Sequence, residues 1–228
     1  MGLTVSANSK RREPTITGLH RAVCFGVIDL GTQTDKMGVG KRKILFLFEF
    51  PDVRCDYEYD GEKINKPDTI RRFYNNTLYE TSALALNLKS WRGRPFTTEE
   101  ADAFDVKNVL GAGCNIYVTH NESKGVVYAN IGDIAPLKKD QEKAVPENPI
   151  LYFSFEDNMD IPNDLLENRS YKWIGDMIMK SPEWIARQQQ QEPSVRDALT
   201  TMADDGMPNP EPLPCDMQDD EFDDDIPF

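Results

Sequence analysis

The sequence has few of the residues that build metal centres and disulfide-linked domains. Its 228 residues include four cysteines and two histidines, with no two cysteines close together and no CxxC pair. A zinc site needs a cluster of Cys, His or carboxylate ligands at short spacings, so we expect no metal site. Scattered cysteines are typical of a reducing compartment, and we expect a cytoplasmic protein.

Long apolar segments are also missing. The longest apolar run spans residues 44–48, and the N-terminal sequence MGLTVSANSKRR has no apolar centre. A membrane-spanning helix needs about 20 apolar residues, and a secretory signal needs an apolar stretch of about 7–15. We therefore expect neither membrane insertion nor secretion.

The short motifs of common enzyme classes are absent as well. The sequence has no GxxxxGK[ST], GxSxG or HExxH motif, and GVGKRK (38–43) does not have the spacing of a phosphate-binding loop. A metal-dependent nuclease needs carboxylates on a rigid framework, but the densest acidic residues lie near the C-terminus. We expect no catalysis and no cofactor, with a nuclease that uses acids of residues 52–62 as the less favoured alternative.

Negative charge is abundant but unevenly distributed. The formal net charge is −13, and residues 192–228 contribute −11 of it from 12 acidic and one basic side chain. Residues 1–145 carry 21 basic and 19 acidic side chains, so this part is nearly neutral and can still bind an anion. The last part has too few large apolar residues to offset the entropy lost on ordering, so we expect a disordered acidic tail.

Hydrophobic patterning predicts a mainly β fold. Strands are predicted at residues 19–31, 43–50, 69–79, 113–121 and 126–137. Between the third and fourth strands, residues 84–91 have helical periodicity, and TTEE at 97–100 is a capping box that predicts a short second helix. This order is that of an OB-fold, a five-stranded Greek-key barrel with its helix between strands three and four.

Proline and turn-forming residues predict the remaining boundaries of the strands and helices. Pro51 is expected to end the second strand, and a turn is expected at residues 60–61. Aromatic residues at 152–155 are expected to pack back on the barrel, and a helix at 171–191 is expected to break at Ser181-Pro182. The predicted domains are a flexible N-terminus (1–17), an OB-fold nucleic-acid-binding domain (18–145), a C-terminal extension whose helix packs on the barrel (146–191) and the acidic tail (192–228).

Basic and aromatic side chains are interleaved along the predicted barrel. The candidate DNA-binding residues are Lys36, Lys41, Arg42 and Lys43 in the first loop, Arg71, Arg72, Phe73 and Tyr74 in the third strand, Arg92 and Arg94 after the helix, and Tyr117, Lys124 and Tyr128 around the last two strands. Cations bind phosphates and rings stack on bases, which is the combination that single-stranded nucleic acid needs. Adjacent strand residues face opposite sides, so we expect only one of Arg71 and Arg72 to face the ligand.

Packing is the competing explanation for several of these residues. Any single arginine is more often a solvated surface residue, and only the clustering favours binding. Trp91 has helical spacing from Leu84 and Leu88, which favours packing over base stacking. Phenylalanines at 46 and 48 alternate with leucines at 45 and 47, so at least one of the two pairs must be core.

The last seven residues, FDDDIPF (222–228), resemble the C-terminal tip of bacterial single-stranded DNA-binding proteins. Four segments of the body, VIDLGTQ (27–33), KRKILFLFEFP (41–51), SWRGRPFT (90–97) and, more weakly, 104–121, resemble single-stranded DNA-binding or replication-associated proteins of bacteriophages and prophages. The resemblance implies an OB-fold, no catalysis, and a role in replication, recombination or repair in the cytoplasm of a bacterial host. It departs from those proteins at the third strand, where few residues match.

The tip has the chemistry of a ligand for a partner protein. The candidate partner-binding residues are Asp223, Asp224, Asp225, Ile226, Pro227 and Phe228. The aspartates suit a basic rim, the two apolar side chains suit a pocket, and the terminal carboxylate suits a cation. The resemblance implies that such partners are replication and recombination proteins of the host or the phage.

These observations predict a sequence-tolerant single-stranded DNA-binding protein that recruits partners through its tip, as a single chain or a homo-oligomer. The first alternative is a non-catalytic interaction protein whose barrel binds a protein or a double-stranded DNA end. A tail that mimics DNA by charge alone is a further alternative, and a nuclease is the least favoured.

Overall fold

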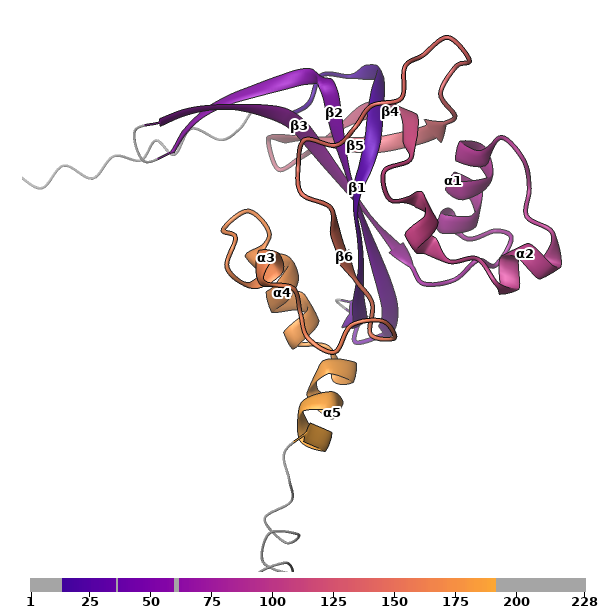
Figure 1. Ribbon diagram of the computed structural model, residues 1–228, viewed down its shortest axis with the longest axis vertical. Helices are drawn as coiled ribbons and strands as arrows, with labels where there is room; N and C mark the ends of the chain where they lie inside the picture. Colours follow the sequence, from indigo (N-terminus) through magenta and orange to yellow (C-terminus); the bar gives the residue numbers. More distant parts are fainter. Residues whose placement is uncertain (1–13, 36, 60–61, 192–228) are drawn as a thin grey trace, which may run out of the picture. The chain divides into compact units, whose positions relative to one another are not determined.

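The computed structural model describes residues 14–35, 37–59 and 62–191, and its fold is mainly β (Figure 1). The strands are β1 (Gly18–Thr34), β2 (Gly40–Tyr59), β3 (Glu62–Asn75), β4 (Gly113–Ser123), β5 (Val126–Ala135) and the short β6 (Leu151–Phe153). The main path through the sheet is β3-β2-β1-β4-β5, with antiparallel neighbours, and β6 pairs in parallel with β1. The sheet curls strongly into a half-barrel that brings β3 and β5, its two edge strands, near each other.

Strand β2 continues through Pro51, so the prediction that this proline ends the strand was wrong. Pairing of β2 with β1 stops at Glu49, and beyond that residue β2 pairs with β3 alone. The register between β2 and β3 shifts between Phe50 and Arg54, which leaves Pro51 in an irregular stretch of a one-sided strand. A proline is tolerated there because no second ladder needs its missing N–H. The predicted turn at 60–61 lies outside the described residues.

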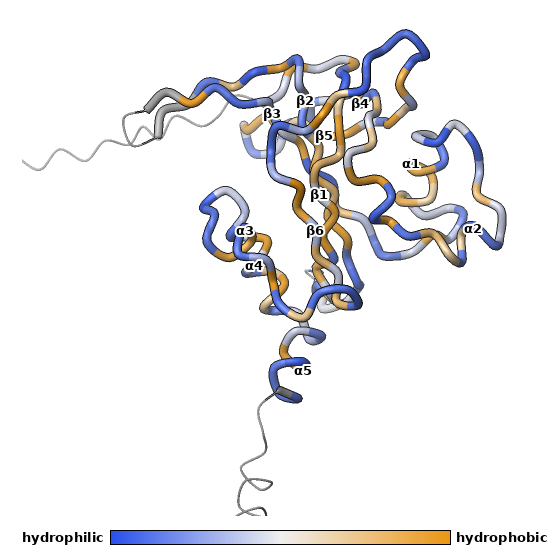
Figure 2. The backbone as a smooth tube through the Cα atoms, in the orientation of Figure 1, coloured by the Kyte–Doolittle hydropathy of each residue, from blue (hydrophilic) through white to orange (hydrophobic). Residues whose placement is uncertain are grey.

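Both faces of β2 are buried, each in its own cluster. Phe46 and Phe48 pack with Trp91 on one face, called here the α1 face. Leu45 and Leu47 pack with the C-terminal extension on the other, called here the α4 face. The hydrophobic colouring of β1, β2 and β6 follows this double burial (Figure 2). Sequence reasoning required one of the two pairs to be core, and both are.

Three helical segments lie between β3 and β4; the first two were predicted, and the third, a 3-10 helix, was not. They are α1 (Ala83–Arg92), α2 (Thr98–Asp102) and the 3-10 helix η1 (Val106–Val109). The capping box at the start of α2 is confirmed, because Thr97 and Glu100 exchange side-chain-to-backbone hydrogen bonds. The packing role predicted for Trp91 is also confirmed, since its ring is buried and its Nε1 donates to the carbonyl oxygen of Gly113 at 2.9 Å.

The C-terminal extension contains β6, α3 (Asn163–Leu166), α4 (Lys172–Met179) and α5 (Pro182–Gln191). The predicted break at Ser181-Pro182 is confirmed, because Ser181 Oγ accepts a hydrogen bond from the backbone N–H of Trp184 as α5 begins. Ile174 and Ile178 of α4 are fully buried on the α4 face. Within the part of the chain that the structure covers, no helix is long and apolar enough to cross a membrane. The chain divides into two units after Gln188, and nearly all described residues belong to the first.

Candidate nucleic-acid interface

A groove of about 580 Å³ lies between the edge strands β3 and β5. Arg71 and Phe73 line it from β3, and Tyr128 and Asn130 line it from β5. Asn121, at the end of β4, adds another amide to the same wall. The groove also has one carboxylate, that of Asp68, which is buried and accepts a hydrogen bond from Thr15. It therefore combines one cation, one buried carboxylate, two aromatic rings and two amides, and we call it the β3–β5 groove.

The strand register decides which of the two adjacent arginines lies on which face. Arg71 pairs with Leu47 and so lies on the α4 face, whereas Arg72 pairs with Phe46 and lies on the α1 face. Arg72 Nη1 donates to the carbonyl oxygen of Ile131 at 2.7 Å. Arg72 therefore holds β3 and β5 together, and Arg71 is the arginine that lines the groove.

The guanidinium of Arg71 has no hydrogen-bond or ion-pair partner among the described residues. It lies over the ring of Trp173 in α4, with Cζ 4.5 Å from the ring centroid. Desolvation lowers the pKa of Arg71, but an arginine stays charged in proteins. Phe73, with 43% of its surface exposed, contacts the same tryptophan edge-on at 6.2 Å between ring centroids.

The other predicted arginines are held by acceptors within the chain. Arg42 donates two hydrogen bonds to Asp29 Oδ2, at 3.1 Å from Nε and 2.5 Å from Nη2. Arg94 and Arg92 both pair with Glu100, and these contacts, led by the hydrogen bonds from Arg94, lower the pKa of Glu100 to about 2. Donors that are already bonded to a carboxylate are poorly available to a phosphate, and Arg92 Nη1, which has no hydrogen-bond partner among the described residues, is buried.

The three predicted lysines that the structure describes do not line the groove. Lys43 Nζ donates to Asn75 Oδ1 at 2.6 Å, so its ammonium is partly used within the sheet. Lys41 is exposed near the start of β2, and Lys124 is exposed in the β4–β5 turn with a φ of 53°. Lys36 lies outside the described residues.

The predicted aromatic residues divide into exposed and buried rings. Tyr117 and Tyr128 expose 50% and 46% of their surface, and both can offer a ring face. Tyr74 is 2% exposed, and burial, which outweighs the hydrogen bond that its hydroxyl accepts from Asn87, raises its pKa to about 12. The assignment of Tyr74 to the binding surface is therefore corrected, because its ring belongs to the α1 face core.

Sequence reasoning missed three residues of this region, namely Trp173, Asn121 and Asn130. Asparagines in a hairpin have no pattern that separates binding from turn formation. Residues 171–191 were predicted to form a helix that packs on the barrel, but nothing in the local sequence shows that the Trp173 ring meets Arg71, about a hundred residues earlier in the chain. The predicted partner-binding residues, Asp223 to Phe228, lie outside the described residues.

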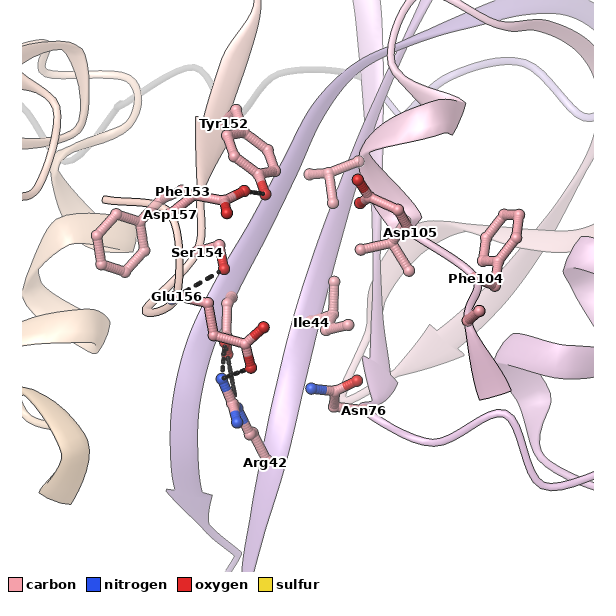
Figure 3. Close-up of a pocket in the computed structure, with 14 residues that line it drawn as sticks. Arg42, Ile44, Asn76, Phe104, Asp105, Tyr152, Phe153, Ser154, Glu156 and Asp157 are labelled. Carbon is pink, nitrogen blue, oxygen red and sulfur yellow. Dashed lines mark hydrogen bonds and ion pairs between the residues drawn. The ribbon is translucent and has the colours of Figure 1, made fainter. Parts of the chain in front are cut away.

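A second cavity, of about 350 Å³, lies between β1, β2, the residues before η1 and those after β6 (Figure 3). Carboxylates dominate its charge, namely those of Asp29, Asp105, Glu156 and Asp157. Tyr152 donates a hydrogen bond to Asp157 across its upper wall. No cluster of His, Cys and acidic residues in the described ranges could hold a metal ion. The negative charge of this cavity disfavours phosphates, so the β3–β5 groove is the candidate interface.

Comparison of the chain with models of protein families, with curated proteins and with solved structures finds no match. Function is therefore inferred from the residues and geometry of the groove and from the sequence of the tail.

Proposed function

We propose that this protein binds single-stranded DNA, with little sequence preference, in the β3–β5 groove. The observation that carries the proposal is the guanidinium of Arg71, which has no acceptor among the described residues and lies beside the exposed ring of Phe73. Tyr128 supplies a second ring in the same groove. A cation for the phosphates and rings for the bases, worth about 1–3 kcal/mol per stacked base, suit a single strand of any sequence.

The proposal includes an OB-fold. Four features support it: the strand path β3-β2-β1-β4-β5, the antiparallel pairing, the approach of β3 to β5, and the helices between β3 and β4. OB-folds bind oligonucleotides on the face of strands two and three. In this chain the C-terminal extension covers Leu45 and Leu47 of β2 on the α4 face. Because this part of β2 is covered, we expect the ligand to bind the exposed residues of β3 and β5 instead.

The decisive experiment measures the affinity of the full-length chain for a fluorescent oligo-dT at several salt concentrations. Arg71→Gln is expected to raise the Kd about 10- to 150-fold, as loss of a charge-assisted hydrogen bond worth about 1.5–3 kcal/mol predicts, and to reduce the salt slope by about 0.7. Phe73→Ala is expected to weaken binding with little change in that slope, because a ring releases no counterions.

Lys89→Gln is the matched control, because it removes one positive charge from an exposed position of α1. It is expected to leave the affinity for oligo-dT nearly unchanged. Equal affinities for the wild type and Arg71→Gln would contradict the placement of the binding site in the groove. Failure of the wild type to saturate at submicromolar concentration would contradict the function.

We also propose that the C-terminal tip recruits replication and recombination proteins. This part rests on the FDDDIPF sequence, with its aspartates, its two apolar side chains and its terminal carboxylate. A peptide of residues 220–228 is expected to compete with the C-terminal peptide of a bacterial single-stranded DNA-binding protein for a bacterial exonuclease. Loss of Phe228 removes the ring and is expected to abolish competition, whereas a tail acting by charge alone would compete equally well without it.

Binding of an extended peptide is the second candidate for the groove. Strands β3 and β5 end the main path of the sheet, so each has backbone groups without a further strand partner in that path. Edge strands of this kind can accept an added strand. A peptide ligand would leave oligo-dT affinity weak and insensitive to Arg71→Gln, whereas DNA binding requires the opposite result.

A further inference from the structure

We propose that Trp173 of α4 positions the guanidinium of Arg71 for a phosphate, so that the C-terminal extension forms part of the DNA-binding site. This inference rests on the proposed function of the β3–β5 groove and extends it to a residue outside the half-barrel. Trp173 does not line the groove; it acts through Arg71, which does.

The contact between the two side chains uses only the face of the guanidinium. Arg71 Cζ lies 4.5 Å from the centroid of the Trp173 ring, a distance typical of a cation–π pair. A guanidinium is planar, so stacking on its face leaves the N–H donors along its edges available for bidentate binding of a phosphate. The ring thus orients the cation without neutralising it, in contrast to Glu100, which occupies the donors of Arg94.

The position of the Trp173 ring is fixed by a hydrogen bond, by the buried residues that follow it in α4 and by a contact with Phe73. Its Nε1 donates to the carbonyl oxygen of Ser170 at 3.0 Å, which fixes the orientation of the indole. The next residue, Ile174, and Ile178 one turn later are fully buried against the half-barrel. Phe73 contacts the indole edge-on, so β3 and α4 meet at this ring. The Trp173 ring on which Arg71 stacks is therefore part of the packed interface between β3 and α4.

The stacking of Arg71 on Trp173 is expected to strengthen DNA binding by preorganising the guanidinium. An unrestrained arginine loses much rotamer freedom when it binds a phosphate. Stacking on Trp173 restricts Arg71 before the ligand arrives, so less freedom is lost on binding. Removal of the ring should therefore weaken DNA binding even though every charge of the protein is kept.

A double-mutant cycle on the full-length chain tests the role of Trp173. Trp173→Leu is expected to raise the Kd for oligo-dT about 3- to 10-fold, the effect of losing a cation–π contact and its preorganisation. In the Arg71→Gln background the same substitution is expected to change the Kd less than about 1.5-fold, because residues that act as one unit are not additive. Trp173→Phe keeps an aromatic face and is expected to restore most of the affinity.

Trp184→Leu is the matched control, because it also removes an indole from the C-terminal extension. Trp184 packs on Phe153, with ring centroids 6.4 Å apart, and has no described contact with Arg71. It is expected to lower thermal stability without changing the Kd for oligo-dT. Thermal melts of all variants separate loss of folding from loss of binding.

Three outcomes would overturn the positioning role. The first is a Trp173→Leu effect that persists undiminished in the Arg71→Gln background, and the second is an equal loss of affinity in Trp184→Leu. The third is a silent Trp173→Leu in a protein that binds oligo-dT and depends on Arg71; in that case the proposed function stands and only the role of Trp173 is lost. A wild type without affinity for oligo-dT would instead overturn the proposed function, and this inference with it.

Discussion

Arg72 Nη1 donates a hydrogen bond of 2.7 Å to the carbonyl oxygen of Ile131, and this bond links the two edge strands of the curled sheet. The guanidinium of Arg72 also lies over the ring of Tyr74, at 5.4 Å from its centroid, on the α1 face. Arg71, the preceding residue, lies on the opposite face with its donors unpaired within the described chain. Two adjacent arginines of β3 therefore have different surroundings, and we expect different consequences when each is replaced.

Arg72→Gln should destabilise the fold more than Arg71→Gln. Loss of the charged donor to Ile131 is expected to lower the free energy of unfolding by about 1.5–3 kcal/mol. Arg71→Gln removes the cation–π contact with Trp173 and is expected to lower it by about 0.5–1 kcal/mol, the value of such a pair at an exposed site. Urea denaturation followed by fluorescence measures both values. Equal destabilisation by the two substitutions would contradict this division of roles.

Glu49 should be essential for attaching the residues that precede β6. Its carboxylate is fully buried and accepts hydrogen bonds from the backbone N–H groups of Glu147 and Asn148, at 2.7 and 3.0 Å, and from Asn148 Nδ2 at 2.6 Å. Glu49→Ala leaves these donors unsatisfied and is expected to cost about 2–4 kcal/mol of unfolding free energy.

Glu49→Gln provides the control, because it keeps one carbonyl oxygen as an acceptor and should cost less. Amide hydrogen exchange of residues 147 and 148 should accelerate in Glu49→Ala before exchange elsewhere in the sheet does. Unchanged protection of these two amides would show that the carboxylate does not hold the segment.

Glu100 should make stability fall in acid. Hydrogen bonds from Arg94, then Thr97 and Arg92, lower its folded-state pKa to about 2 from an ordinary 4.5, so the unfolded state binds a proton more readily. The stabilising effect is complete above the unfolded pKa and is lost as the pH falls from about 4.5 toward 2. The wild type should therefore have a higher Tm than Glu100→Gln at neutral pH, and the difference should vanish near pH 2. A Tm difference that does not depend on pH would contradict the ion-pair origin.

Gly175→Ala should weaken the packing of α4 on α3 and thereby displace the Trp173 ring on which Arg71 stacks. A Cβ at this position would lie 2.3 Å from the carbonyl oxygen of Leu165, too close for any side chain. Alanine normally stabilises a helix relative to glycine by about 1 kcal/mol, but the overlap with α3 should reverse the sign and cost roughly 1–3 kcal/mol. Thermal unfolding and oligo-dT affinity should both decline; a gain in Tm would show that α3 and α4 are not packed this closely.

Features that depend on neighbouring residues could be predicted from the sequence. The capping box of Thr97 and Glu100 and the helix break at Ser181 each need only residues a few positions apart. The alternation of Phe46 and Phe48 with Leu45 and Leu47 required at least one buried face, but it could not reveal the second. Burial of both faces depends on the C-terminal extension, which packs there from more than a hundred residues further along the chain.

The prediction that β2 ends at Pro51 was wrong for the same reason, because the end of the strand depends on residues far away in the sequence. A proline interrupts a strand that is paired on both sides, and sequence alone does not show how many partners a strand has at a given residue. Pairing of β2 with β1 ends at Glu49, so Pro51 meets only one partner strand.

The sequence by itself determined the mainly β character, the helices between the third and fourth strands, and the set of cations and rings from which an interface can be built. Only the tertiary structure decided which of them are available. Tyr74 is buried, Arg42 is held by Asp29, and Arg71 meets Trp173, a partner about a hundred residues further along the chain. The physical reason is that a charge or a ring can bind a ligand only if no nearer group has already satisfied it, and the nearest groups are set by folding.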